Sequence, residues 1–317
     1  MFAFMIKRFL WFIPTILAIA LVTFIMMNLT PGSPFQPAGA NNLREDIIKQ
    51  IEKQYGLDKP LPVRFVIYLG KAVRGDFGES YTRRPQKVND IIRRGFPISF
   101  QLGAMALLAA SIGGIILGVL AAVNQNGWID YLSATFAIMF YSVPSFVLGI
   151  LLLLLFVIWI PNWTGVRLFP LGGWDGPRAW VLPTIALGAG PFAQLARYTR
   201  SSMIDVIRSD YVRTARAKGL AEQKVVLKHV LKNALIPVIT LIGPLFAALA
   251  TGSFFVEQVF NIPGIGKFFV VSMASKDQPM IMAVVLLYGT FLAVMNLVVD
   301  ILYGVIDPRI RMSIRGD

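Results

Sequence analysis

Long hydrophobic stretches separated by polar segments dominate the chain. Six of them reach or approach the ~20 residues that a helix needs to cross a bilayer core. These stretches are Phe9–Leu29, Phe100–Val123, Ser133–Ile160, Val181–Tyr198, Ile236–Val256 and Ile281–Val305. The pattern predicts an all-α polytopic membrane protein with six transmembrane helices. The fourth helix is the least regular of the six in sequence, because Gly188, Gly190 and Pro191 interrupt its hydrophobic stretch.

The first stretch follows Lys7 and Arg8 and could be mistaken for a signal peptide. It is longer than the about 7–15 apolar residues of a signal sequence. It also ends in Pro31 and Gly32, which are typical of a helix stop. We therefore expect a retained anchor helix over residues 1–30.

Composition and charge support the membrane assignment. The chain is 56% hydrophobic and 15% charged, and its 30 basic and 17 acidic residues give a net charge of +13. A basic excess can indicate nucleic-acid binding, but in a membrane protein it is expected on the cytoplasmic side, beside anionic lipid. Nine basic and three acidic residues lie between positions 197 and 232. This asymmetry predicts that the basic segment and both termini are cytoplasmic, with membrane lipid and not nucleic acid as a contact.

The stretches divide the chain into three parts. The anchor at 1–30 is followed by an extracytoplasmic segment at 31–99, and a core domain at 100–317 contains a cytoplasmic loop at about 200–235. The segment at 31–99 is too polar to cross a membrane, yet its apolar residues recur at helical spacing, so we expect it to fold. Glycines in the second stretch, such as Gly114 and Gly118, favour close helix packing.

Few residues offer catalytic or metal-binding chemistry. The chain has no cysteine and a single histidine, His229, so thiolate and multi-histidine metal sites are excluded. The segment Pro263–Lys267 lacks the full phosphate-binding pattern of nucleotide hydrolases. We predict no enzymatic activity and no cofactor in this chain.

Asp300 lies within the last hydrophobic stretch, where an acidic residue is usually paired or functional. We favour structural pairing over a gating role for Asp300.

The most informative polar segment is the loop Asp210–Pro237. Asp210 is predicted to cap a short helix, and Gly219 supplies the left-handed conformation that ends it. A second helix is expected from about Ala221 into the fifth span, with Pro237 near the membrane boundary. Alanines at 215 and 217 would let a partner approach the backbone, and nearby basic side chains would orient it. The loop is therefore either a docking site for a partner or a basic surface that contacts lipid headgroups.

The loop sequence DYVRTARAKGL, followed by KHVLKNALIP, resembles the coupling loop of permeases from ATP-binding-cassette (ABC) importers. Ala215, Gly219 and Pro237 fit that motif, whereas Arg213 and Thr214 replace its usual glutamate and first alanine. Five other segments are similar to the dipeptide, oligopeptide and nickel permease subfamily, in its first-subunit type. They are LTPGSPF, YGLDKPLPVRF, RGDFGES, VEQVFNIPGIGK and DILYGVIDPRIR.

This resemblance implies the transmembrane domain of a type I ABC importer in the bacterial cytoplasmic membrane. Its implied partners are a homologous second permease subunit, two ATPase subunits that bind ATP and Mg²⁺, and an extracytoplasmic substrate-binding protein. The implied ATPase-coupling residues are Asp210, Tyr211, Arg213, Thr214, Ala215, Arg216, Ala217, Lys218, Gly219 and Leu220. The implied substrate is a di- or oligopeptide, with nickel or another small solute as alternatives. An ion-coupled secondary transporter is a different class, for which Asp300 alone is thin support.

Overall fold

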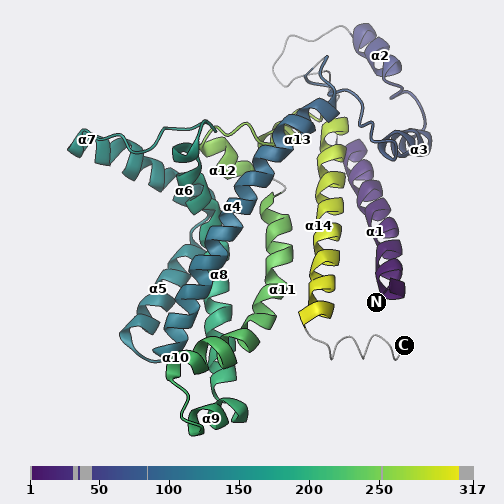
Figure 1. Ribbon diagram of the computed structural model, residues 1–317. Helices are drawn as coiled ribbons and strands as arrows, with labels where there is room; N and C mark the ends of the chain where they lie inside the picture. Colours follow the sequence, from purple (N-terminus) through teal and green to yellow (C-terminus); the bar gives the residue numbers. More distant parts are fainter. Residues whose placement is uncertain (1, 31–34, 36–44, 84, 251–252, 307–317) are drawn as a thin grey trace.

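The computed structural model describes residues 2–30, 35, 45–83, 85–250 and 253–306, and these residues are almost entirely helical (Figure 1). The elements are α1 (Phe2–Leu29), α2 (Glu45–Gln54), α3 (Leu61–Ala72), α4 (Val88–Val123), α5 (Trp128–Ser142), α6 (Ser145–Leu153), η1 (Leu154–Trp159), α7 (Ile160–Thr164), α8 (Pro177–Ile207), α9 (Asp210–Ala217), α10 (Glu222–Lys224), η2 (Val225–Val230), α11 (Leu231–Ala250), α12 (Phe254–Val259), α13 (Gly266–Ala274) and α14 (Gln278–Ile306). Six helical runs of the described residues are long and apolar enough to cross a membrane, which confirms the six predicted spans.

The third predicted span is not one straight helix. Val143 has φ −86° and ψ 121°, and Pro144 has φ −56° and ψ 139°, so the helix breaks between α5 and α6. The residue before a proline is sterically pushed out of the α region, which explains the position of the break. Figure 1 shows α6 and α7 leaving the direction of α5. The third spanning run of the described residues is therefore Ser145–Thr164, and the predicted span over 133–160 also includes the second half of α5.

The fourth span is the best packed, contrary to what its glycines and prolines suggested. Helix α8 is continuous over its 31 residues, with Pro183 and Pro191 inside it. It packs against α4, α5, α6 and α11. A proline lacks the N–H that would close a helix hydrogen bond, but neighbouring helices can satisfy the carbonyl that is freed, so the two prolines do not break the helix here.

Helix α4 begins at Val88, twelve residues before its hydrophobic stretch, because a helix can extend past the apolar part of its sequence.

Small residues bring α4 close to its neighbours. A Cβ added at Gly118 would lie 2.6 Å from the backbone oxygen of Ala196 on α8, and one added at Gly103 would lie 2.6 Å from the backbone of Ala250 on α11. No real Cβ atom tolerates such a distance. The glycines of α4 therefore fill the helix-packing role predicted from the sequence.

A buried carboxylate attaches the segment before α4 to the start of α14. Asp277 is 1% exposed and accepts hydrogen bonds from the Ser80 hydroxyl, from the Tyr81 N–H at 3.1 Å and from the Thr82 hydroxyl at 2.9 Å. A buried acid is tolerated when several donors surround it. Residues 80–82 are thereby fixed against the spanning helices.

A second buried carboxylate, Glu257 on α12, joins the loop before α13 to α4. It accepts hydrogen bonds from the Ser99 hydroxyl at 2.7 Å and from the Gly266 N–H at 2.8 Å. A Cβ at Gly264 would lie 2.5 Å from both the Glu257 carboxylate and the Ser99 hydroxyl, so this loop requires glycine. Burial raises the pKa of Glu257 to about 6, against the opposing effect of these hydrogen bonds.

Replacing Gly118 by alanine tests the contact between α4 and α8. The added Cβ must push the helices apart, and overpacking of this kind lowers stability by about 1–3 kcal/mol. We expect a lower thermal unfolding midpoint in detergent. Gly190→Ala on α8 is the control, because a Cβ there meets nothing within 4 Å and alanine favours helix. Equal midpoints for the two variants would contradict the packing argument.

Glu257 should make stability depend on pH. Its folded-state pKa of about 6 lies above the ordinary value of 4.5, so between these values the folded protein binds more protons than the unfolded chain. Stability therefore falls as pH rises through this window, by about 2 kcal/mol at most. In the wild-type chain, the unfolding midpoint should fall between pH 4.5 and about 6. We expect Glu257→Gln to remove the contribution of Glu257 to this fall. The control Glu79→Gln, at an exposed position, should leave that contribution in place. A wild-type pH profile in Glu257→Gln would refute this assignment.

Candidate coupling site on the basic loop

The short helix α9 begins and ends almost as the sequence indicated. Gly219 has φ +78°, the left-handed conformation predicted to end the helix. The predicted cap was wrong by one residue, because Ser209 occupies the capping position and its hydroxyl donates to the Val206 carbonyl at 2.6 Å. Asp210 is the first helical residue, where its charge still favours the positive end of the helix dipole.

One face of α9 packs inward. Val212 and Ala215 are buried in a cluster with Met203 of α8 and with Val225 and Val230 of η2. Ala215 is 6% exposed, so the expectation that it presents a small surface to a partner was wrong. Its small size instead lets α9 approach η2. The inner face of α9 is therefore packed against α8 and η2.

The other face of α9 is exposed and basic. Its exposed residues are Asp210, Tyr211, Arg213, Thr214, Arg216, Ala217, Lys218 and Gly219, and Leu220 is half-buried. Arg216 forms a two-point ion pair with Glu222, at 2.6 Å and 3.1 Å. Arg213 lies 3.8 Å from Asp210, but both side chains are at least 80% exposed, and such a pair contributes little. Arg213, Ala217 and Lys218 thus form an exposed basic surface around a small residue.

The loop is connected rigidly to two spanning helices. The run from α10 through η2 into α11 confirms the predicted second helix, and Pro237 lies inside α11. The Ser202 hydroxyl of α8 donates to the Ala234 carbonyl of α11 at 2.8 Å. The Tyr211 hydroxyl of α9 accepts a hydrogen bond from the Asn233 side chain at 2.9 Å. Hydrogen bonds thus join α8 to α11 and α9 to α11.

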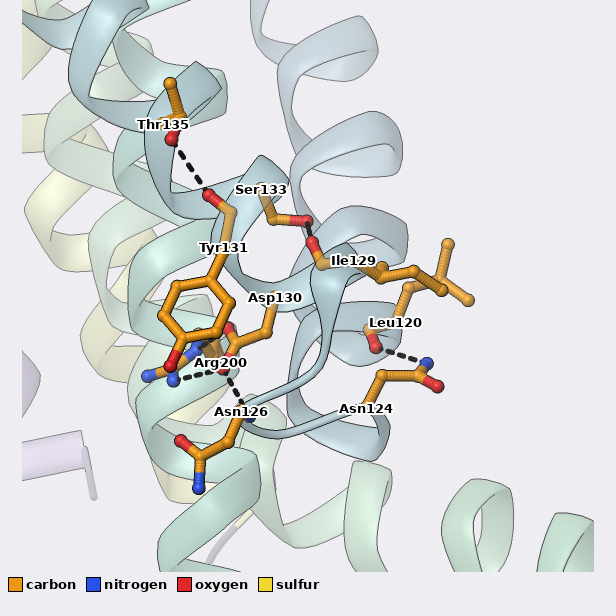
Figure 2. A network of polar contacts seen from close by, with 9 residues as sticks. All are labelled: Leu120, Asn124, Asn126, Ile129, Asp130, Tyr131, Ser133, Thr135 and Arg200. Carbon is orange, nitrogen blue, oxygen red and sulfur yellow. Dashed lines mark hydrogen bonds and ion pairs between the residues drawn. The ribbon is translucent and has the colours of Figure 1, made fainter.

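An ion pair that the sequence analysis missed joins α5 to α8 (Figure 2). Asp130 of α5 is 3% exposed, and its two carboxylate oxygens bind Arg200 of α8 at 2.5 Å and 2.7 Å. The Asn126 N–H, in the turn between α4 and α5, donates to the same carboxylate at 2.9 Å. Asp130 follows Gly127 at the edge of a hydrophobic stretch. An acidic residue at such a position is common in the first turn of a helix and does not by itself indicate a buried ion pair. Only the fold reveals its partner 70 positions away.

A cavity of about 410 Å³ opens beside this ion pair and is lined mostly by small residues of α4, α5 and α8, together with Leu117, Ile138, Arg197 and Arg200. The Arg197 guanidinium lies over the Tyr141 ring at 5.1 Å. Both cations are on α8, one turn apart, and each is directed to a group on α5. Polar contacts between α5 and α8 thus occur near both the first and the last turn of α5.

Comparison with known families decides the class of the protein. Residues 114–312 match the family described as the inner membrane component of binding-protein-dependent transport systems, and residues 1–103 match the N-terminal region of such components. The chain belongs to this transporter family. It is therefore a multi-pass permease component of the bacterial inner membrane.

Curated members of the family match the permease over nearly its whole length. It is 44% identical to the dipeptide transport system permease protein DppB of Bacillus subtilis, over 99% of both chains. It is 41% identical to DppB of Lactococcus lactis, over 98% of this chain and 100% of that one. It is 40% identical to the oligopeptide transport system permease protein OppB of Escherichia coli K12, with the same coverage.

Solved structures support the predicted fold. Two crystal forms of the MetNI methionine ABC transporter in inward-facing conformations match 68% of the permease and 96% of the compared chain. The TM-scores are 0.52 and 0.55, at 15% and 17% sequence identity. At this identity the match establishes the fold alone, which is the transmembrane domain of a type I ABC importer.

Two expectations for the permease stay predictions. Asp300 lies in α14, but its side chain is outside the described residues, so neither pairing nor gating is tested. Figure 1 shows the first turn of α1, the last turn of α14 and α9 at the same end of the molecule. The assignment of that end to the cytoplasm rests on the positive-inside rule.

Breaking the Asp130–Arg200 pair should destabilise the permease. Asp130→Asn leaves a partly buried guanidinium with a weaker partner, and a hydrogen bond to a charged group contributes about 1.5–3 kcal/mol. We expect a lower unfolding midpoint, and little further loss when Arg200→Gln is added. Asp210→Asn is the matched control, because its pair with Arg213 is exposed and should contribute under about 1 kcal/mol. Equal effects of the two aspartate substitutions would contradict the role of burial.

Proposed function

We propose that this chain forms the translocation path for di- or oligopeptides as one of two homologous permease subunits. Two ATPase subunits would bind ATP and Mg²⁺, and an extracytoplasmic binding protein would deliver the peptide. The peptide substrate is supported by 44% and 40% identity, over at least 98% of the chain, to relatives named for dipeptide and oligopeptide transport. No bond is made or broken by this subunit in the proposed cycle.

The observation that carries the coupling proposal is the two-faced character of α9. Its buried face is packed on α8 and η2, whereas its outer face is basic, small and exposed. An ATPase groove could therefore hold the Ala217 side of the helix while acids on its rim pair with Arg213 and Lys218. Closure of the two ATPases would displace α9, and α8 and α11 would follow. The partner thus biases a two-state permease between outward and inward openings.

Exposed residues of α9 provide the sharpest test of ATPase docking. Arg213→Glu reverses a charge and Ala217→Trp adds bulk, in each case without disturbing the buried face. We expect each to lower co-purification of the ATPase subunits at least about tenfold, since interface hot spots exceed 1.4 kcal/mol. Arg178→Glu, exposed at the opposite end of α8, should leave it unchanged. Ala215→Trp is a poorer test, because it disrupts packing inside the loop.

The same preparations test the transport function. Reconstituted with its partner subunits, the wild-type chain should accumulate a labelled tripeptide in an ATP-dependent, vanadate-sensitive manner, and Arg213→Glu should abolish uptake. Accumulation of nickel in preference to peptide would replace the substrate assignment. Uptake driven by a proton gradient, without ATPases, would refute the ABC mechanism. ATPase co-purification at wild-type level in both α9 variants would refute docking on this helix.

A further inference from the structure

A basic cavity of about 580 Å³ lies where α1, α3 and the start of α14 meet, at the end of the molecule opposite α9. Five basic and two acidic side chains line it. The basic residues are Lys53, Lys59, Arg64, Lys71 and Lys87, and the acidic ones are Asp76 and Glu79. The Asp76 carboxylate already accepts a hydrogen bond from the Gly78 N–H at 3.0 Å. The cavity is therefore suited to a negatively charged ligand.

Two polar side chains one turn apart on α3, Arg64 and Tyr68, line the inside of this cavity. Arg64 is half-buried, lies over the Phe24 ring at 5.8 Å and donates one hydrogen bond to Gln278 at 3.1 Å. A guanidinium has five N–H donors, and the hydrogen bond to Gln278 uses one of them. The Tyr68 hydroxyl is buried, and no hydrogen-bond partner for it occurs among the described residues. A buried hydroxyl without a partner is rare and calls for an explanation.

The position of α3 relates the cavity to the lipid bilayer. Phe65, Tyr68 and Leu69 pack on Ala20 and Phe24 of α1. Phe24 lies five residues before the end of α1, about 7–8 Å along its axis. The apolar run of α1 is Leu10–Leu29, whose 20 residues extend about 30 Å and match the thickness of the hydrocarbon core. Phe24 therefore lies in the outer part of the hydrocarbon core, about 7–8 Å from its boundary with the headgroups.

The outer surface of α3 is apolar. Val63, Val66 and Ile67 are 45%, 67% and 41% exposed. A short helix that buries one apolar face against α1 and exposes another is typical of an element embedded in the membrane interface. A water-soluble anion or an acidic protein surface would use the basic cavity alone. An anionic lipid would use both the cavity and the apolar surface beside it.

We propose that this cavity binds the phosphate of an anionic phospholipid headgroup, held by Arg64, Tyr68 and the surrounding lysines. The acyl chains of this lipid lie against the exposed face of α3 and the neighbouring surface of α1. N–H groups of Arg64 that Gln278 does not use donate to phosphate oxygens, and a small rotation of the Tyr68 side chain, which lines the cavity, brings its covered hydroxyl to the same phosphate. Phosphate is the natural partner of a guanidinium, because both groups form paired hydrogen bonds.

Native mass spectrometry of the purified full-length chain in detergent tests this site. The chain is titrated with phosphatidylglycerol or with phosphatidylcholine of the same acyl length. We expect one phosphatidylglycerol molecule to be retained at concentrations where phosphatidylcholine is lost. Arg64→Gln should weaken this binding at least about tenfold, and Tyr68→Phe about threefold or more. Tyr68→Phe removes one oxygen atom, so its fold should be preserved. Arg74→Gln, an exposed cation of the same segment outside the cavity, is the matched control.

Competition distinguishes the sources of the anion. Inorganic phosphate or glycerophosphoglycerol, which lacks acyl chains, should displace the lipid only at much higher concentration. Displacement at equal concentration would overturn the lipid assignment in favour of a soluble anion. Displacement by a phosphate-free acidic peptide would overturn it in favour of a protein contact. Unchanged affinity in both Arg64→Gln and Tyr68→Phe would refute the site. The measurement needs no ATPase and no substrate, so its failure would leave the proposed transport function untouched.

Discussion

The close approach of α4 to α8 determines where the other core helices lie. At Gly118 the two backbones are so near that even a methyl group has no room. Water drives little helix association inside a bilayer, so packing of this kind supplies much of the attraction between spanning helices. Helices α5, α6 and α11 then pack around α8. The core domain is thus built around one tight helix pair, and α1 is added to it mainly through α14.

Buried carboxylates position the connections between these helices. Asp130 holds the turn between α4 and α5 to α8, Glu257 holds the loop before α13 to α4, and Asp277 holds residues 80–82 to the start of α14. Each carboxylate has two or more donors, which offsets the loss of hydration. Apolar helix faces can pack in several registers at similar free energy. A buried carboxylate, by contrast, is satisfied only in the register that places its hydrogen-bond donors around it. These three acids therefore define the ends of the helix bundle.

The sequence predicted the spans well and the polar contacts poorly, for a physical reason. Hydropathy indicates which segments are apolar enough to enter the bilayer, and the hydropathy of a segment depends only on its own amino-acid composition. Prolines alone do not predict where a helix breaks: the chain leaves the helical conformation before Pro144, but α8 continues through Pro191, because a proline is tolerated where its surroundings satisfy the backbone. The partners of Asp130 and Asp277 lie 70 and about 196 positions away. In the loop, the end of α9 at Gly219 was predictable because glycine readily adopts the left-handed conformation. The burial of Ala215 was not predictable, because it depends on where η2 lies.

The arrangement of contacts separates parts of the chain that move with α9 from parts that do not. Helix α9 packs on α8 and η2, and the Asp130–Arg200 pair makes α5 follow α8. Separating a buried ion pair leaves charges without partners, so the pair disfavours a shift between the two helices that it joins. Displacement of α9 should therefore carry α4, α5, α8 and α11 together. Among the described residues, the main helix contact of α1 with the rest of the bundle is with α14. An anionic lipid bound beside Arg64 would hold that peripheral part in the membrane while the core helices rotate against it.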